Sequence, residues 1–185
     1  MRIAVVAWGS LVWNRGILLL TEDWRPEGPV LPIEFSRVSD NGRLTLVIDE
    51  THGANVQSFF ATSALEDLSL AVANLMEREH IQNVDRVGVY ISYSNSFSAR
   101  AKKVHPSACE AIASWSRTRG LDAVIWTALA PRFKEKTGET FSPESAIRYL
   151  RTLDGATRED ALQYIREAPS QVQTPVRDLA GVLLG

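Results

Sequence analysis

The chain contains few of the residues that build covalent cross-links and metal clusters. Its 185 residues include one cysteine, Cys109, and three histidines. A single cysteine can form neither a disulfide within the chain nor the thiolate set of a structural zinc site. His52, His80 and His105 are spaced too irregularly for a metal-binding motif. We therefore expect no metal site, and the low use of cysteine is typical of a reducing compartment.

The chain also lacks a strong net charge and long apolar runs. The formal net charge is −2, and Arg100, Lys102 and Lys103 form the only short basic cluster, which does not favour a nucleic-acid partner. No apolar run approaches the roughly 20 residues of a membrane-spanning helix. The opening Met-Arg-Ile-Ala-Val-Val is a strand pattern rather than a signal segment. These features predict a cytoplasmic protein without a membrane partner, and they leave the oligomeric state open.

The composition is that of a globular protein, with 45% hydrophobic and 23% charged residues, and the length predicts a single domain over residues 1–185. Residues 1–104 are expected to form a β-rich core. Two of its strands meet across Asp40-Asn41-Gly42, which is a hairpin signature. One helix, about residues 63–79, is predicted to open with a capping box at Ser63-Ala64-Leu65-Glu66. The expected strands are Ile3 to Ala7, Ile33 to Val38, Leu44 to Asp49, Val56 to Ala61, Val87 to Tyr93 and Phe97 to Val104.

Residues 105–185 are expected to be mainly helical. Helix formers run from His105 to Arg119, and Gly120 is a stop signal. Ser142-Pro143-Glu144 predicts the start of another helix, and a strand is predicted at about residues 121–129. Strands without regular alternation, followed by segregated helices, indicate the α+β class.

The stretch AWGSLVWNRG, residues 7–16, follows the first expected strand. A glycine permits unusual backbone dihedrals, and the amides of Gly9, Ser10 and Leu11 can converge as a nest for a carboxylate or oxyanion. The Ser10 hydroxyl adds a donor, and Trp8 and Trp13 are candidate pocket walls. The alternative is a simple turn. We therefore take these five residues as candidate substrate-binding residues.

Glu79 is the candidate catalytic residue. With about 100° per residue around the helix, Glu79 lies near 20° from Leu68 and within the apolar stripe, whereas Glu77 points away. Burial at a helix C-terminus raises the pKa of a carboxyl group, as a general base working near neutrality requires. Arg78 is not expected to be its neutralising partner. The alternative is that the helix has unwound at Glu79, whose side chain then reaches water.

These features together resemble the γ-glutamylcyclotransferase-like family, and within it the ChaC-type branch. The family's first strand ends in Tyr-Gly-Ser-Leu or Tyr-Gly-Ser-Asn, which corresponds here to Trp8-Gly9-Ser10-Leu11. Val12-Trp13-Asn14 is similar to the Ile-Trp-Lys/Asp/Asn of that branch. The branch's catalytic glutamate lies in Leu-x-x-Arg-Glu, here Leu75-Met76-Glu77-Arg78-Glu79. The resemblance covers about residues 3–80.

The resemblance implies a mixed, barrel-like sheet surrounded by helices, and a reaction. The α-amine of a γ-glutamyl group attacks its own γ-carbonyl, which gives 5-oxoproline and a free amine without a metal or cofactor. Two positions differ: Trp8 replaces a tyrosine, and His80-Ile81-Gln82 replaces the Gly-Gly-Tyr that follows Arg-Glu in this branch. A non-catalytic module that binds a carboxylated small molecule, and an amide-bond enzyme with a substrate that is not γ-glutamyl, remain alternatives.

Overall fold

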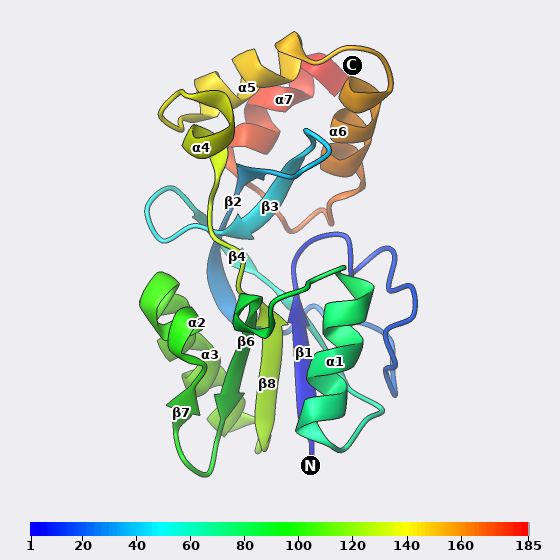
Figure 1. Cartoon of the computed structure of the whole chain (residues 1–185), viewed down its shortest axis with the longest axis vertical. Coiled ribbons are helices and arrows are strands. Elements are labelled where there is room, and N and C mark those ends of the chain that lie inside the picture. The colour runs from blue at the N-terminus through cyan, green and yellow to red at the C-terminus, as the bar shows by residue number, and fades with distance from the viewer. Residues whose placement is uncertain (185) are drawn as a thin grey trace.

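The computed structural model describes residues 1–184, and it has the α+β architecture that the sequence predicts. Figure 1 shows two sheets stacked along the long axis, with helices around them and the two termini at opposite ends. The lower sheet has five strands in the order β5-β1-β8-β6-β7. They are β1 (Ile3–Ala7), β5 (Phe59–Thr62), β6 (Val87–Ile91), β7 (Ser96–Phe97) and β8 (Ala123–Thr127).

Strand β1 lies inside the five-stranded sheet, parallel to β8 and antiparallel to β5. Its side chains alternate between two apolar clusters, because successive residues of a strand point to opposite faces. Ala4 and Val6 pack into the larger cluster, whereas Ile3, Val5 and Ala7 pack into the smaller one. A strand that is buried on both faces reads as a continuous apolar run, which is why the opening segment was predictable.

The upper sheet consists of β2 (Val30–Val38), β3 (Leu44–Ile48) and β4 (Ala54–Gln57), in the order β3-β2-β4. The predicted hairpin across Asp40-Asn41-Gly42 is confirmed as β2 and β3. Strand β2 contains a bulge, because five residue steps from Ile33 to Val38 face only four steps from Ile48 to Leu44. A bulge turns the following side chain to a new direction, and here that residue is Arg37.

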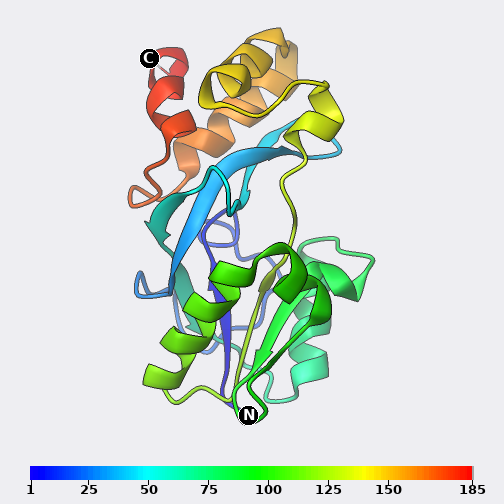
Figure 2. The same ribbon diagram turned by 90° about the vertical axis from the view of Figure 1, so that its left-hand side faces the viewer.

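Helices cover both sheets (Figures 1 and 2). Helix α1 packs on one face of the five-stranded sheet, and α2 and α3 pack on the other. Helices α4 to α7 cover the three-stranded sheet. Among residues 1–184, no helix has the combined length and apolar character that crossing a membrane requires. The helices are α1 (Leu68–Arg78), the 3-10 helix η1 (Val84–Arg86), α2 (Ala99–Val104), α3 (Pro106–Thr118), α4 (Phe133–Thr137), α5 (Pro143–Thr152), α6 (Gly155–Glu167) and α7 (Pro175–Leu184).

The expectation of one barrel-like sheet is wrong, because the strands form two separate sheets. The predicted strand Val56 to Ala61 divides at Ser58 into β4 and β5, which belong to different sheets. The Ser58 backbone N–H and hydroxyl both donate to the carbonyl of Pro29, at 3.2 and 2.6 Å. These bonds hold Ser58 outside both strand ladders, so the chain crosses from one sheet to the other at this point.

Two further expectations are corrected. The helix begins at Leu68, five residues later than predicted, with Asp67 as its N-cap. Ser63 instead pairs with Leu20 in an isolated bridge, and its hydroxyl accepts from the Leu65 N–H at 3.0 Å within a local turn. The predicted strand Phe97 to Val104 is mostly helix α2.

Candidate functional site

A cavity of about 240 Å³ lies at the waist of the molecule, between the two sheets. The end of β1 and the end of α1 border it from below, and the β2–β3 hairpin and α6 border it from above. Five of the six candidate residues from the sequence line it. Trp13 is the exception. The lining comprises Ala7, Trp8, Gly9, Ser10, Leu11, Arg37, Ser39, Asp40, Arg43, Thr45, Leu46, Glu79, His80, Ile81, Arg86, Thr127, Leu129 and Tyr164.

The loop after β1 is a short helical turn. The Val12 N–H donates to the Gly9 carbonyl at 2.9 Å, and the Asn14 N–H donates to the Ser10 carbonyl at 2.8 Å. The N–H groups of Gly9 and Leu11 have no acceptor among residues 1–184. Backbone N–H groups at the start of such a turn carry partial positive charge and suit an anion, so the loop can bind a carboxylate or an oxyanion.

Gly9 is needed for close packing, not for an unusual backbone conformation. The glycines with positive φ in the described chain do not include Gly9, so the expectation from backbone freedom is wrong. A Cβ at this position would lie 2.8 Å from the phenol oxygen of Tyr164. Helix α6 thus places the Tyr164 hydroxyl directly against the loop, and Trp13 packs edge-on against the Tyr164 ring with centroids 5.2 Å apart.

Glu79 is the C-cap residue of α1, directly after Arg78, and lies against the cavity. Its N–H still donates to the Leu75 carbonyl at 3.0 Å, so the helix has not unwound before it. Only 18% of its side chain is exposed, whereas Glu77 is exposed. Burial raises the pKa of Glu79, and the positive charges of Arg78, His80 and Arg43 partly oppose this rise.

The C-terminus of α1 is a Schellman motif. The Ile81 N–H donates to the Met76 carbonyl at 2.8 Å, and the His80 N–H donates to the Glu77 carbonyl at 3.3 Å. His80 has a φ of 53°, in the left-handed region that glycine usually occupies at this position. The motif buries Ile81 and leaves His80 at the mouth of the cavity.

Arg78 joins Glu79 to the loop. Its guanidinium pairs with the Glu79 carboxylate at 3.0 Å. It also donates to the carbonyl of Arg15 at 3.1 Å and to that of Asn14. Arg78 is therefore the ion-pair partner of Glu79, contrary to the expectation from the sequence, and it fixes the carboxylate relative to the loop.

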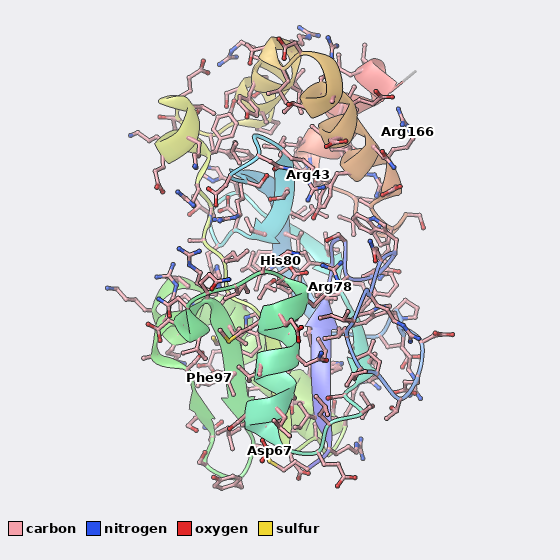
Figure 3. The ribbon with its side chains drawn as sticks, turned by 45° about the vertical axis from the view of Figure 1, so that its right-hand side comes forward. Arg43, Asp67, Arg78, His80, Phe97 and Arg166 are labelled. Atoms are coloured by element: carbon pink, nitrogen blue, oxygen red, sulfur yellow. The ribbon has the colours of Figure 1, made fainter. Side chains whose placement is uncertain are left out.

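Arg43 approaches the cavity from the opposite side (Figure 3). Figure 3 places Arg43 on the three-stranded sheet, across the waist from Arg78 and His80 at the upper end of α1. Its guanidinium carbon lies 4.6 Å from the centre of the Tyr164 ring, and its buried Nε has no partner among residues 1–184. Burial raises the pKa of Tyr164 to about 12, so the phenol stays protonated at neutral pH.

Within residues 1–184, no three His, Cys, Asp or Glu side chains cluster in a way that could hold a metal ion. The chain matches no family model, no curated protein and no solved structure.

The sequence did not single out Arg37, Arg43, Arg86 or Tyr164. Arg43 follows the hairpin turn and could have been found as a cation next to a predicted strand. Tyr164 lies 155 residues after Gly9, in helix α6, and no local pattern connects the two. Arg37 faces the cavity because of the bulge in β2, which a period-two pattern does not reveal.

Proposed function

We propose that the protein is a γ-glutamylcyclotransferase-like enzyme. It converts a γ-glutamyl amide or peptide to 5-oxoproline and a free amine, with Glu79 as the general acid and base. The observation that supports this most strongly is the partly buried Glu79 carboxylate, which has a raised pKa and faces the same cavity as a loop with free backbone N–H groups.

In the proposed reaction, Glu79 takes a proton from the α-ammonium group of the substrate. The neutral amine then forms a C–N bond to the γ-carbonyl carbon, and the carbonyl oxygen becomes an oxyanion. The carbonyl re-forms as the bond to the leaving nitrogen breaks, and Glu79 gives its proton to that nitrogen. The regenerated carboxylate then accepts the second proton of the attacking nitrogen, which becomes the lactam N–H, and passes it to the released amine. No water is consumed. A partly buried carboxyl group with a raised pKa suits both steps, because it accepts a proton more readily than an exposed one and can give it back.

The N–H groups of Gly9 and Leu11 are proposed to bind the substrate's α-carboxylate or the developing oxyanion. Arg78 holds Glu79 near this loop through its bonds to Asn14 and Arg15. Fixed geometry of this kind matters because the reacting amine and carbonyl must be held in an orientation that allows attack.

Two differences from the related family are compatible with this proposal. Trp8 lacks the phenol that the family has at the end of its first strand, but Tyr164 brings a phenol to the same loop. The glycine that follows Arg-Glu in the ChaC-type branch is His80 here, and His80 adopts the left-handed conformation that suits a glycine.

Release of 5-oxoproline from glutathione and from a panel of γ-glutamyl amides tests the proposal. The wild-type protein should release it, and Glu79→Gln should reduce the rate at least about a hundredfold, because general acid–base catalysis contributes roughly 10²–10⁴-fold. Glu77→Gln is the matched control, since Glu77 is a neighbouring but exposed acid, and it should keep the wild-type rate. Equal turnover by Glu79→Gln would remove Glu79 from the mechanism. Binding of the panel without turnover would instead favour a binding module.

A further inference from the structure

A second cavity, of about 280 Å³, adjoins the candidate active site. Arg37, Arg86 and Leu129 line both cavities, so the two form one continuous recess. Arg100 and Arg132 border the second cavity as well. The reaction proposed above uses none of these arginines. Their presence in the recess therefore needs a separate explanation.

Arg37 is held in position by the backbone around it. The bulge in β2 directs it toward the segment after β8, where its Nη1 donates to the carbonyl of Ala130 at 3.0 Å. The same segment is fixed to β2 by the Arg132 N–H, which donates to the Ser36 carbonyl at 3.2 Å. Arg37 is only 8% exposed, and burial together with the positive charges of Arg132 and Arg86 lowers its pKa. A buried guanidinium beside like charges is costly unless an anion joins it.

Arg86 is the last residue of η1 and lines both cavities. Its backbone carbonyl accepts from the Ala128 N–H at 2.7 Å, which fixes its backbone at the junction of the two cavities. Its side chain is exposed. Among residues 1–184, neither Arg37 nor Arg86 forms an ion pair with an acidic side chain. Both guanidinium groups therefore keep donors for a ligand.

The acidic residues along the recess are already paired. Glu79 pairs with Arg78 at 3.0 Å. Asp40 pairs with Lys136 at 3.0 Å and lies 3.7 Å from Arg132. Glu135 pairs with Arg132 at 2.9 Å. The unpaired charge at the junction is thus positive.

From this arrangement we infer an anion subsite formed by Arg37 and Arg86. It binds a carboxylate or phosphate group carried by the amine half of the substrate, on the far side of the scissile amide from the Gly9 loop. The assignment to the amine half rests on the proposed function, since Glu79 and the Gly9 loop take the γ-glutamyl half. Planar guanidinium groups form paired hydrogen bonds with both kinds of anion.

The subsite is tested by binding, with ligands that cannot cyclise. Glutaryl amides keep the carboxylate and the amide of a γ-glutamyl compound but lack its α-amine. Glutaryl-β-alanine and glutaryl-phosphoethanolamine carry an anion on the amine half, and glutaryl-propylamide is their neutral counterpart. Calorimetry should give the anionic ligands an affinity at least about tenfold higher at low salt, because charge-assisted hydrogen bonds are the stronger class. The ratio between the two anionic ligands distinguishes a carboxylate site from a phosphate site.

Substitutions assign the preference to the named arginines. Arg86→Gln should remove most of the difference between anionic and neutral ligands without affecting the fold, because its side chain is exposed. Arg37→Gln should have the same effect, provided that this variant of a buried residue still folds. Arg151→Gln is the control, since Arg151 is exposed on α5 and borders neither cavity; it should leave the preference unchanged.

Equal affinity for anionic and neutral ligands would overturn the inference, as would the absence of binding by every anionic ligand or a full preference in Arg86→Gln. A preference for anions in a protein that does not cyclise the corresponding γ-glutamyl amides would contradict the proposed function and leave the subsite in place. The two proposals therefore fail separately.

Discussion

The contact between Gly9 and Tyr164 predicts a specific non-additive effect. A Cβ at Gly9 would lie 2.8 Å from the Tyr164 oxygen, whereas ordinary contacts begin at 3.4 Å, so the hydroxyl would have to move by 0.6 Å. The next nearest atoms, in Leu46 and in the Tyr164 ring, lie 3.9 Å away. The hydroxyl alone therefore obstructs an alanine. Overpacking of this kind costs roughly 1–3 kcal/mol, so we expect Gly9→Ala to lower the free energy of unfolding by that amount.

Tyr164→Phe removes the obstructing atom and keeps the ring. In that background Gly9→Ala should be neutral or stabilising by up to about 1 kcal/mol, because alanine restricts the unfolded chain. Urea denaturation of the wild type, the two single variants and the double variant gives the coupling free energy between the two substitutions, which should be at least about 1 kcal/mol. Gly181→Ala is the control, because a Cβ there meets no atom within 4 Å in helix α7, and it should stabilise by roughly 0.5–1 kcal/mol. An equal cost of Gly9→Ala in both backgrounds would refute this account of the loop.

Three further predictions concern buried groups. Burial lowers the pKa of His105 from 6.5 to about 4. The contribution of neutral His105 to the free energy of unfolding is therefore complete above pH 6.5 and is lost as the pH falls toward 4. Over this range the free energy of unfolding of His105→Gln should fall less steeply than that of the wild type, in parallel denaturation series. The Cys109 side chain is fully buried, and burial raises its pKa to about 11. A thiol reagent should therefore not react with the native protein at pH 7, but it should label one thiol after unfolding. Burial also raises the pKa of Glu79 above 4.5, so this carboxyl group binds protons more tightly in the folded state than in the unfolded state. As the pH rises above 4.5, the free energy of unfolding of Glu79→Gln should therefore increase relative to that of the wild type in parallel denaturation series. A difference that shrinks with rising pH would contradict a raised pKa of Glu79.

The local elements of this fold were predictable where one pattern dominated. Three patterns favoured a single local structure each: the apolar run of β1 a strand, the turn at Asp40-Asn41-Gly42 a hairpin, and the apolar stripe that includes Glu79 a helix. The segment Phe97 to Val104 allowed two. Phe97, Ala99 and Ala101 alternate as in a strand, whereas Ala101 and Val104 have the spacing of one helix face. The structure adopts the helix, which the alanine and lysine residues of this segment favour.

The candidate site was predictable only in its N-terminal half. Gly9 and Glu79 could be recognised because each lies in a short motif. Tyr164 and Arg37 could not, since their positions depend on a helix packing against a distant loop and on a bulge in β2. Contacts of this kind come from tertiary packing, which a single sequence does not encode in its local periodicity.

The products distinguish cyclisation of the γ-glutamyl group from hydrolysis of the amide. A γ-glutamyl amide with an anionic amine half, such as γ-glutamyl-β-alanine, is incubated with wild-type protein and with Glu79→Gln, and the products are identified by mass spectrometry. We expect one 5-oxoproline for each β-alanine released by the wild type, and almost none from Glu79→Gln. Formation of glutamate, or equal 5-oxoproline from both proteins, would contradict it.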